Sequence, residues 1–228
     1  MIQDIAQQET FFHSRLFKGL SKEDMQEVAG FTKSKRIKAG SYLFRQHSQA
    51  THAYTLISGA LMLERTSQSG RRQVIDFSHP GNFIGITNND EFEFSVYCLR
   101  DAHLQCYVRN SFLELADRNP VLKNNIRRTG SNVLTHTLDQ LFALGQKKAH
   151  ERVCYLLHEL SLRQSGTDRE TIDLFMNRQD IADYLGLTIE TVSRAFSKLK
   201  KDGIIAVDSP HRVRIVEHEQ LDALASAR

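Results

Sequence analysis

Three polar side chains in the C-terminal part of the chain have the types and spacing needed to read DNA bases. Glu190, Ser193 and Arg194 stand at positions i, i+3 and i+4, so a helix would place them on one face. A glutamate can accept a hydrogen bond from the amino group of cytosine, and an arginine can donate two to guanine O6 and N7. The trio therefore predicts contact with base edges in the major groove of double-stranded DNA.

The residues around this trio predict two short helices joined by a tight turn within residues 176–205. Asn177 is a good N-cap for the first helix, in which Ile181 and Leu185 share one face. Gly186 can end that helix in a left-handed conformation. Thr188 can cap the second helix. The inward positions of the second helix are Val192, Phe196 and Leu199. This arrangement is a helix-turn-helix, whose second helix lies in the major groove.

Basic side chains concentrate on the same element. The chain has a net charge of +3, and residues 187–216 alone carry six basic and three acidic side chains. Residues 204–207 and 212–216 flank a turn at 208–211 and predict a hairpin, or wing, whose basic tip can touch phosphates. A helix over 147–163, a loop over 164–169, a strand over 171–176 and a closing helix over 219–225 complete this domain.

The stretch 176–205 resembles the winged helix-turn-helix of the Crp/Fnr family of bacterial transcription regulators. The run Glu-Thr-Val-Ser-Arg at 190–194 is similar to the Fnr and FixK branch, which uses these positions to read TTGAT-type half-sites. Ile189 stands where the catabolite-activator branch carries arginine. The resemblance implies a homodimer on an inverted repeat, with RNA polymerase as a further partner. The residues that match family positions holding the DNA backbone are Arg178, Gln179, Thr188 and Thr191. Lys198 and Arg212 are further candidates for phosphate contact because of their charge.

The N-terminal half predicts a different architecture. Ser21 can cap a short helix that carries Met25, Val28 and Ala29 on one side. Turn signals at Gly40, Gly59, Gly70 and 80–81 then separate short strands. The candidate strands are 41–45, 53–58, 60–66, 71–77, 94–99 and 103–108. Such a series predicts an antiparallel roll or jelly roll. It resembles the β-roll effector domain that holds cyclic nucleotides in other Crp/Fnr members.

A long helix is predicted between the two domains. A helix over 110–117 is followed by Pro120, which suits the first position of the next helix, over 121–145. Its apolar residues recur at roughly 3.5-residue spacing, as in a coiled-coil seam; they are Ile126, Val133, Leu134, Leu138, Leu141 and Leu144. An amphipathic helix packed on its own domain is the alternative to the family's dimerisation helix. The predicted fold is α+β: a β-roll sensor domain with an N-terminal helix (1–117), a dimerisation helix (118–145) and a winged helix-turn-helix (146–228).

The cyclic-nucleotide site of the family is not matched. Members that bind cAMP carry a glutamate for the ribose shortly after a glycine, then an arginine for the cyclic phosphate. The corresponding run is 80–86 followed by 94–95, where Ile86 replaces the acid and Phe94 replaces the arginine. A phosphate buried without a guanidinium partner would lose its strongest interaction. We therefore expect no cAMP binding, although the roll could accommodate another ligand.

The cysteines do not predict an iron–sulfur cluster. Fnr proteins that carry one use a cysteine group near the N-terminus plus one further cysteine, whereas the first cysteine here is Cys98. Three thiols cannot supply a four-thiolate site. Cys98 and Cys106 fall in phase with apolar neighbours and are expected in the core. Cys154 is expected there too, with redox sensitivity if it is exposed.

Haem is the remaining cofactor to consider, because some family members bind it through the β-roll. His47, His52 and His79 are candidates, although surface or capping roles are commoner for histidine. The sequence has no G-x-S-x-G motif, no P-loop and no metal-ligand spacing. We therefore expect neither enzymatic activity nor a metal site. The absence of a disulfide framework, a signal peptide and a long apolar segment predicts a cytoplasmic protein without membrane contact.

The simplest hypothesis is a cofactor-free, homodimeric DNA-binding regulator controlled by its abundance or by modification. A haem- or small-molecule-responsive sensor of the same family is the first alternative. An interaction module that does not retain specific DNA is the second. The family suggests an activator, although the residues leave the effector, the target genes and the choice between activation and repression open.

Overall fold

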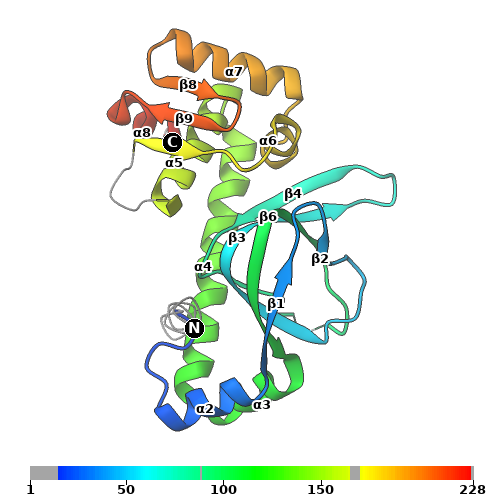
Figure 1. Cartoon of the computed structure of the whole chain (residues 1–228). Helices are drawn as coiled ribbons and strands as arrows, with labels where there is room; N and C mark the ends of the chain where they lie inside the picture. The colour runs from blue at the N-terminus through cyan, green and yellow to red at the C-terminus, as the bar shows by residue number, and fades with distance from the viewer. Residues whose placement is uncertain (1–14, 88, 165–169, 227–228) are drawn as a thin grey trace. The chain divides into compact units, whose positions relative to one another are not determined.

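The computed structural model describes residues 15–87, 89–164 and 170–226 (Figure 1). It combines an antiparallel sheet, long helices and a C-terminal helix-turn-helix, as the sequence predicts. Two compact units are present: residues 1–71 with 75–135, and residues 72–74 with 136–228. Their boundary falls within the long helix α4 (Pro120–Gln146), whereas the sequence pattern suggests a joint at 145–146.

The first unit is built on a sheet with the strand order β1-β6-β3-β4. The strands are β1 (Thr32–Ile37), β2 (Tyr42–Phe44), β3 (His52–Thr66), β4 (Arg72–Ser78), β5 (Phe83–Ile84) and β6 (Ser95–Val108). β2 pairs with β6 and β5 pairs with β3, both antiparallel. The long antiparallel pair β3–β6 therefore forms the centre of the roll, and β1 lies at its edge.

One predicted turn, at Gly59, and one predicted break between strands, at 100–102, are wrong. The segments 53–58 and 60–66 form the single strand β3, and 94–99 with 103–108 form most of β6. Gly59 has a φ of +98°, yet it marks a β-bulge, because the register with β6 shifts between Leu56, Ser58 and Ala60. A Cβ at Gly59 would lie 2.5 Å from the carbonyl oxygen of Asp101. Glycine is thus required by a close approach inside the sheet rather than by a turn.

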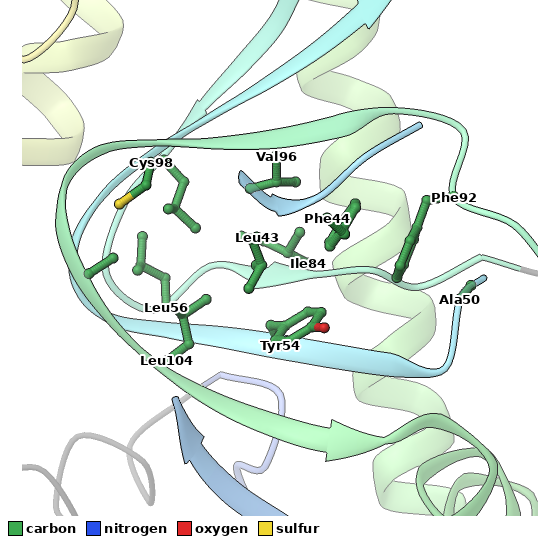
Figure 2. Packing of buried hydrophobic residues seen from close by; sticks show 12 residues of the cluster. Leu43, Phe44, Ala50, Tyr54, Leu56, Ile84, Phe92, Val96, Cys98 and Leu104 are labelled. Carbon is green, nitrogen blue, oxygen red and sulfur yellow. The ribbon is translucent and has the colours of Figure 1, made fainter. Parts of the chain in front are cut away.

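Two apolar clusters stabilise the roll. The first lies between the long strands, with Leu56, Val96 and Leu104 fully buried (Figure 2). The second joins the helices α2 (Lys22–Gly30), α3 (Arg109–Arg118) and the first turns of α4 to the roll through Tyr107 and Phe112. Ser21 forms the predicted cap of α2, but Ala29 is exposed rather than packed with Met25 and Val28.

In its described residues the second unit contains the end of α4, four further helices and a small sheet with the order β7-β9-β8. The elements are α5 (Ala149–Gln164), β7 (Thr171–Asp173), α6 (Arg178–Leu185), α7 (Ile189–Lys201), β8 (Ile205–Ser209), β9 (Arg212–Ile215) and α8 (His218–Ser226). β7 is shorter than predicted, and the predicted loop falls, except for Gln164, outside the described residues. No helix in the described parts of the chain is long and apolar enough to cross a membrane.

Candidate nucleic-acid interface

The first helix of the motif, α6, has the predicted ends. The Asn177 side chain accepts a hydrogen bond from the backbone N–H of Asp180 at 2.9 Å, and the Asp180 carboxylate accepts one from the N–H of Asn177 at 3.1 Å. This reciprocal cap satisfies two amides that have no partner within the helix. Gly186 ends the helix with a φ of +60°, in the left-handed region. Ile181 and Leu185 are buried, so the inward face is the predicted one.

The second helix, α7, presents the predicted trio to solvent. Thr188 caps it by accepting a hydrogen bond from the N–H of Thr191 at 3.3 Å. The inward residues Val192, Phe196 and Leu199 are all buried, and Ala195 joins them. The side chains that the same periodicity turns outward are exposed: Glu190, Ser193 and Arg194. The structure therefore brings the three together on one helical face, where major-groove reading would need them.

Hydroxyl groups position the charged members of the trio. Arg194 donates from Nη2 to Thr191 Oγ1 at 3.2 Å, and that oxygen lies 3.1 Å from Thr188 Oγ1. The pKa of Glu190 is lowered, first by a hydrogen bond from its own backbone N–H, then by the Thr188 hydroxyl and by the charge of Arg194. Glu190 is thus held as a carboxylate, an acceptor suited to the amino group of cytosine.

The serine of the trio is turned back toward the helix. Ser193 donates to the carbonyl of Ile189 at 2.9 Å, and Ser197 donates to the carbonyl of Ser193 at 3.0 Å. Ser197 is exposed one turn further along α7 and is missing from the predicted site. Its i+4 spacing from Ser193 is the signal that could have found it.

Arg178 and Gln179, on the first turn of α6, are already engaged. The guanidinium carbon of Arg178 lies 3.6 Å from the centroid of the Phe196 ring, a cation–π contact that joins α6 to α7. Partial burial lowers the pKa of Arg178, and its buried Nη1 has no hydrogen-bond partner in the described parts of the chain. Gln179 donates to Asp183 at 2.7 Å. Arg178 lies on the first turn of α6, where phosphates bind favourably, but its Nη1 donor is buried and not open to one.

The two other phosphate candidates form exposed ion pairs. Lys198 Nζ lies 2.7 Å from Asp202 Oδ2, and Arg212 Nε lies 3.3 Å from Asp173 Oδ1. In the wing, Arg214 faces Asp208 at 3.9 Å. Exposed pairs of this kind contribute about 0–1 kcal/mol, so an incoming phosphate can replace the carboxylate at small cost.

Helix α4 carries an exposed apolar stripe. Its members are Val133, Leu134, Leu138, Leu141 and Phe142, and Leu141 is 64% exposed. Phe142 is absent from the predicted seam, although its i+4 spacing from Leu138 is the signal that could have included it. Ile126 behaves differently, because it is half-buried against the chain's own second cluster. We define the stripe below by the five exposed residues.

The places expected to hold a cyclic nucleotide contain apolar side chains. Phe94 is half-buried against the first cluster, with its ring centroid 5.8 Å from that of Phe44. Phe44 in turn stacks on Phe92 at 3.6 Å (Figure 2). Ile86 is 42% exposed. Neither Ile86 nor Phe94 can hydrogen-bond a ribose or a phosphate, so these residues do not fit the nucleotide.

Two of the three cysteines have the predicted burial. Cys98 and Cys154 are buried, and burial raises the pKa of the Cys154 thiol to about 12. Cys106 is half-buried rather than buried, because it lies on β6 opposite Lys33 of the edge strand.

The candidate haem ligands differ in their surroundings. His47 is exposed and lies 3.6 Å from Glu91, and His52 contacts Thr51 at 2.9 Å. His79 is half-buried, and its backbone N–H donates to Asn82 Oδ1 at 2.7 Å. No cluster of three His, Cys, Asp or Glu residues suited to a metal occurs within residues 15–87, 89–164 and 170–226.

An antiparallel roll and a winged helix-turn-helix with an exposed polar recognition face define a class of DNA-binding regulators. Residues 34–119 match the cyclic nucleotide-binding domain family, and residues 151–224 match the Crp-like helix-turn-helix domain family. The chain is 33% identical over 211 residues to the transcriptional activatory protein AadR of Rhodopseudomonas palustris, covering 91% of this chain and 87% of AadR. It therefore belongs to the Crp/Fnr family of transcription regulators, on the FixK branch.

Two further comparisons support membership of the same family. The nitrogen fixation regulation protein FixK of Bradyrhizobium diazoefficiens is 30% identical over 217 residues, covering 94% of this chain and 91% of FixK. The solved structure of FixK2 from Bradyrhizobium japonicum superposes with a TM-score of 0.81 at 27% identity, covering 86% of this chain and 98% of that one. The names of AadR and FixK describe transcriptional activation and regulation.

Proposed function

We propose that this regulator binds as a homodimer to an inverted repeat of TTGAT-like half-sites about one helical turn apart. The observation that carries the proposal is the shared exposed face of Glu190, Ser193 and Arg194 on α7. Arg194 reads guanine, Glu190 accepts from cytosine, and the N-terminal turns of α6 and α7 with the wing hold phosphates. The names of the relatives, transcriptional activatory protein and probable transcriptional activator, favour activation, with RNA polymerase as the partner.

The α4 stripe supports the proposed dimer. Its residues recur at helical spacing and remain exposed in the single chain, and a contiguous exposed apolar patch marks an interaction surface. Pairing with the same stripe of a second copy would bury this surface and relate two recognition helices by a two-fold axis. An inverted repeat has the same symmetry.

The proposed regulator acts in the cytoplasm without cAMP and without an iron–sulfur cluster. The apolar residues at positions 86 and 94 support the first point, and the lack of an N-terminal cysteine group supports the second. The proposal includes no enzymatic activity. Control would then come from the amount of protein or from its modification.

Replacement of Arg194 tests the reading face. We expect Arg194→Ala to weaken binding to the cognate inverted repeat by about 1–3 kcal/mol and to relax preference at the guanine of each half-site. Fluorescence anisotropy at fixed salt, with cognate, guanine-substituted and random duplexes, measures both effects. Lys200→Ala is the matched control, because it removes one positive charge from the same helix. Equal losses on cognate and random DNA would show that Arg194 contacts phosphate and would contradict the proposed reading.

A further inference from the structure

A hollow of about 380 Å³ opens on the surface of the β-roll, and Ala102 of the first apolar cluster is part of its lining. It is lined by the end of β1 and the residue after it, by the start of the β3 bulge and by the middle of β6. The lining residues are Arg36, Ile37, Lys38, Ser58, Asp101, Ala102 and His103. All of them belong to the first compact unit, and none belongs to the DNA-reading face.

The strand register places three of the polar lining residues on one side of the sheet. Arg36 of β1 stands directly opposite His103 of β6, and His103 stands directly opposite Ser58 of β3. Directly paired residues point to the same face, so these three side chains form a row across three neighbouring strands. Lys35, opposite the fully buried Leu104, belongs to the other face.

The row has the character of an anion site. Arg36 is exposed and forms no ion pair with any described residue. His103 is only 7% exposed, and its Nε2 lies 2.7 Å from Ser34 Oγ, which fixes the ring. The exposed guanidinium of Arg36 and the exposed hydroxyl of Ser58 lie on either side of this ring and can donate to one group of oxygens.

The rim of the hollow is of mixed charge. Lys38 Nζ lies 2.7 Å from Asp101 Oδ2, and Asp101 also accepts from the N–H of Ala39 at 2.9 Å. A carboxylate at the rim would repel a polyanion, but it can accept hydrogen bonds from hydroxyl groups. The volume lies within the range of small-molecule sites, which is about 300–1,000 Å³.

We propose that this hollow binds a small organic phosphate that carries hydroxyl groups. The phosphate lies against Arg36, His103 and Ser58, and the hydroxyl groups face Asp101. A guanidinium suits phosphate because its N–H groups match the spacing of two oxygens. The site is separate from the proposed DNA-reading face and does not depend on it.

Calorimetry on the full-length protein tests the site, with ribose 5-phosphate as the probe and ribose as the uncharged comparison at equal ionic strength. We expect saturable binding of ribose 5-phosphate and no saturable heat with ribose. Arg36→Ala should weaken binding about tenfold or more, and Ser58→Ala should weaken it several-fold. Lys33→Ala is the matched control, because it removes a positive charge from the same strand on the opposite face, and should change affinity less than about twofold.

Three results would overturn the assignment. The first is no saturable binding of ribose 5-phosphate by the unchanged protein. The second is an equal loss in Arg36→Ala and Lys33→Ala, which would show diffuse attraction to a basic edge strand. The third is a larger effect of Arg36→Ala on random duplex DNA than on ribose 5-phosphate, which would assign Arg36 to polymer phosphates. None of these results bears on the reading of DNA by Arg194.

Discussion

Arg194 differs from the other basic residues of the helix-turn-helix unit in the kind of group that holds it. Its partner is the neutral hydroxyl of Thr191, whereas Lys198 and Arg212 lie against carboxylates. Leaving a hydroxyl costs less electrostatic free energy than leaving a carboxylate. Arg194 is therefore restrained in direction but free to donate to a base, which is what a reading residue requires.

The three cysteine thiols should differ in reactivity because they differ in burial. Alkylation with iodoacetamide at pH 8 should modify Cys106 first, and Cys98 and Cys154 only after unfolding. Cys106 is half-buried, whereas Cys154 is buried and burial raises its pKa to about 12, so little reactive thiolate is present. Mass spectrometry of digested protein over a time course measures the order. Modification of Cys154 as fast as Cys106 in the folded protein would contradict it and would make Cys154 a candidate redox sensor.

The β3 bulge contains Gly59, and any other residue at this position would force the neighbouring backbone to shift. Gly59→Ala should lower the free energy of unfolding by several kcal/mol, because the new Cβ would meet Asp101 O at 2.5 Å and the φ of +98° is also unfavourable. Gly70→Ala is the matched control. Its φ is +79°, but nothing lies within 4 Å of the new Cβ, so it should cost only about 1–2 kcal/mol. Denaturant unfolding followed by circular dichroism compares the two. Equal losses would show that φ, and not the close approach, requires glycine at position 59.

The elements that sequence could predict are those fixed by local signals. Asn177, Gly186 and Thr188 act within one turn of their own positions, so the ends of α6 and α7 could be predicted. Gly59 could not be recognised as a bulge, because its close neighbour Asp101 is distant in sequence. β1 was not predictable from periodicity, because four of its six residues are exposed and none alternates with an apolar residue.

The candidate DNA-reading site and the hollow could also be predicted only where local signals fix the residues. The outward position of the trio follows from helical periodicity alone, but the threonine contacts that orient Arg194 and Glu190 depend on side-chain conformation. The row of Arg36, His103 and Ser58 depends on strand register, which no local pattern in these segments specifies.

A charged residue in the α4 stripe should prevent the proposed dimer from forming. Leu138→Asp places a carboxylate where a second copy would bury it, and its desolvation is costly. We expect a monomer at concentrations where the unchanged protein is dimeric, with weaker operator binding, as measured by light scattering and anisotropy. Asn132→Asp is the matched control, since it adds the same charge on the opposite face of the helix. A dimeric Leu138→Asp variant with unchanged operator affinity would place the interface elsewhere.

At the scale of the whole molecule, cyclic nucleotides should not change DNA binding. A ligand shifts a conformational equilibrium only through different affinities for the two states, and Ile86 and Phe94 offer neither a ribose acceptor nor a phosphate donor. Calorimetry with millimolar cAMP or cGMP should show no saturable heat, and operator affinity should stay constant. A tenfold gain in operator affinity on adding either nucleotide would contradict this prediction.

The α4 stripe has a consequence for how steeply such a regulator responds to its own synthesis. If only the dimer binds an inverted repeat firmly, the concentration of protein able to bind DNA is the dimer concentration. While monomers predominate, that concentration rises with the square of the total chain concentration. A doubling of synthesis then raises operator occupancy roughly fourfold, and dilution by cell growth lowers it equally steeply. Five exposed apolar residues on one helix would thus give the proposed dimer a concentration threshold for DNA binding.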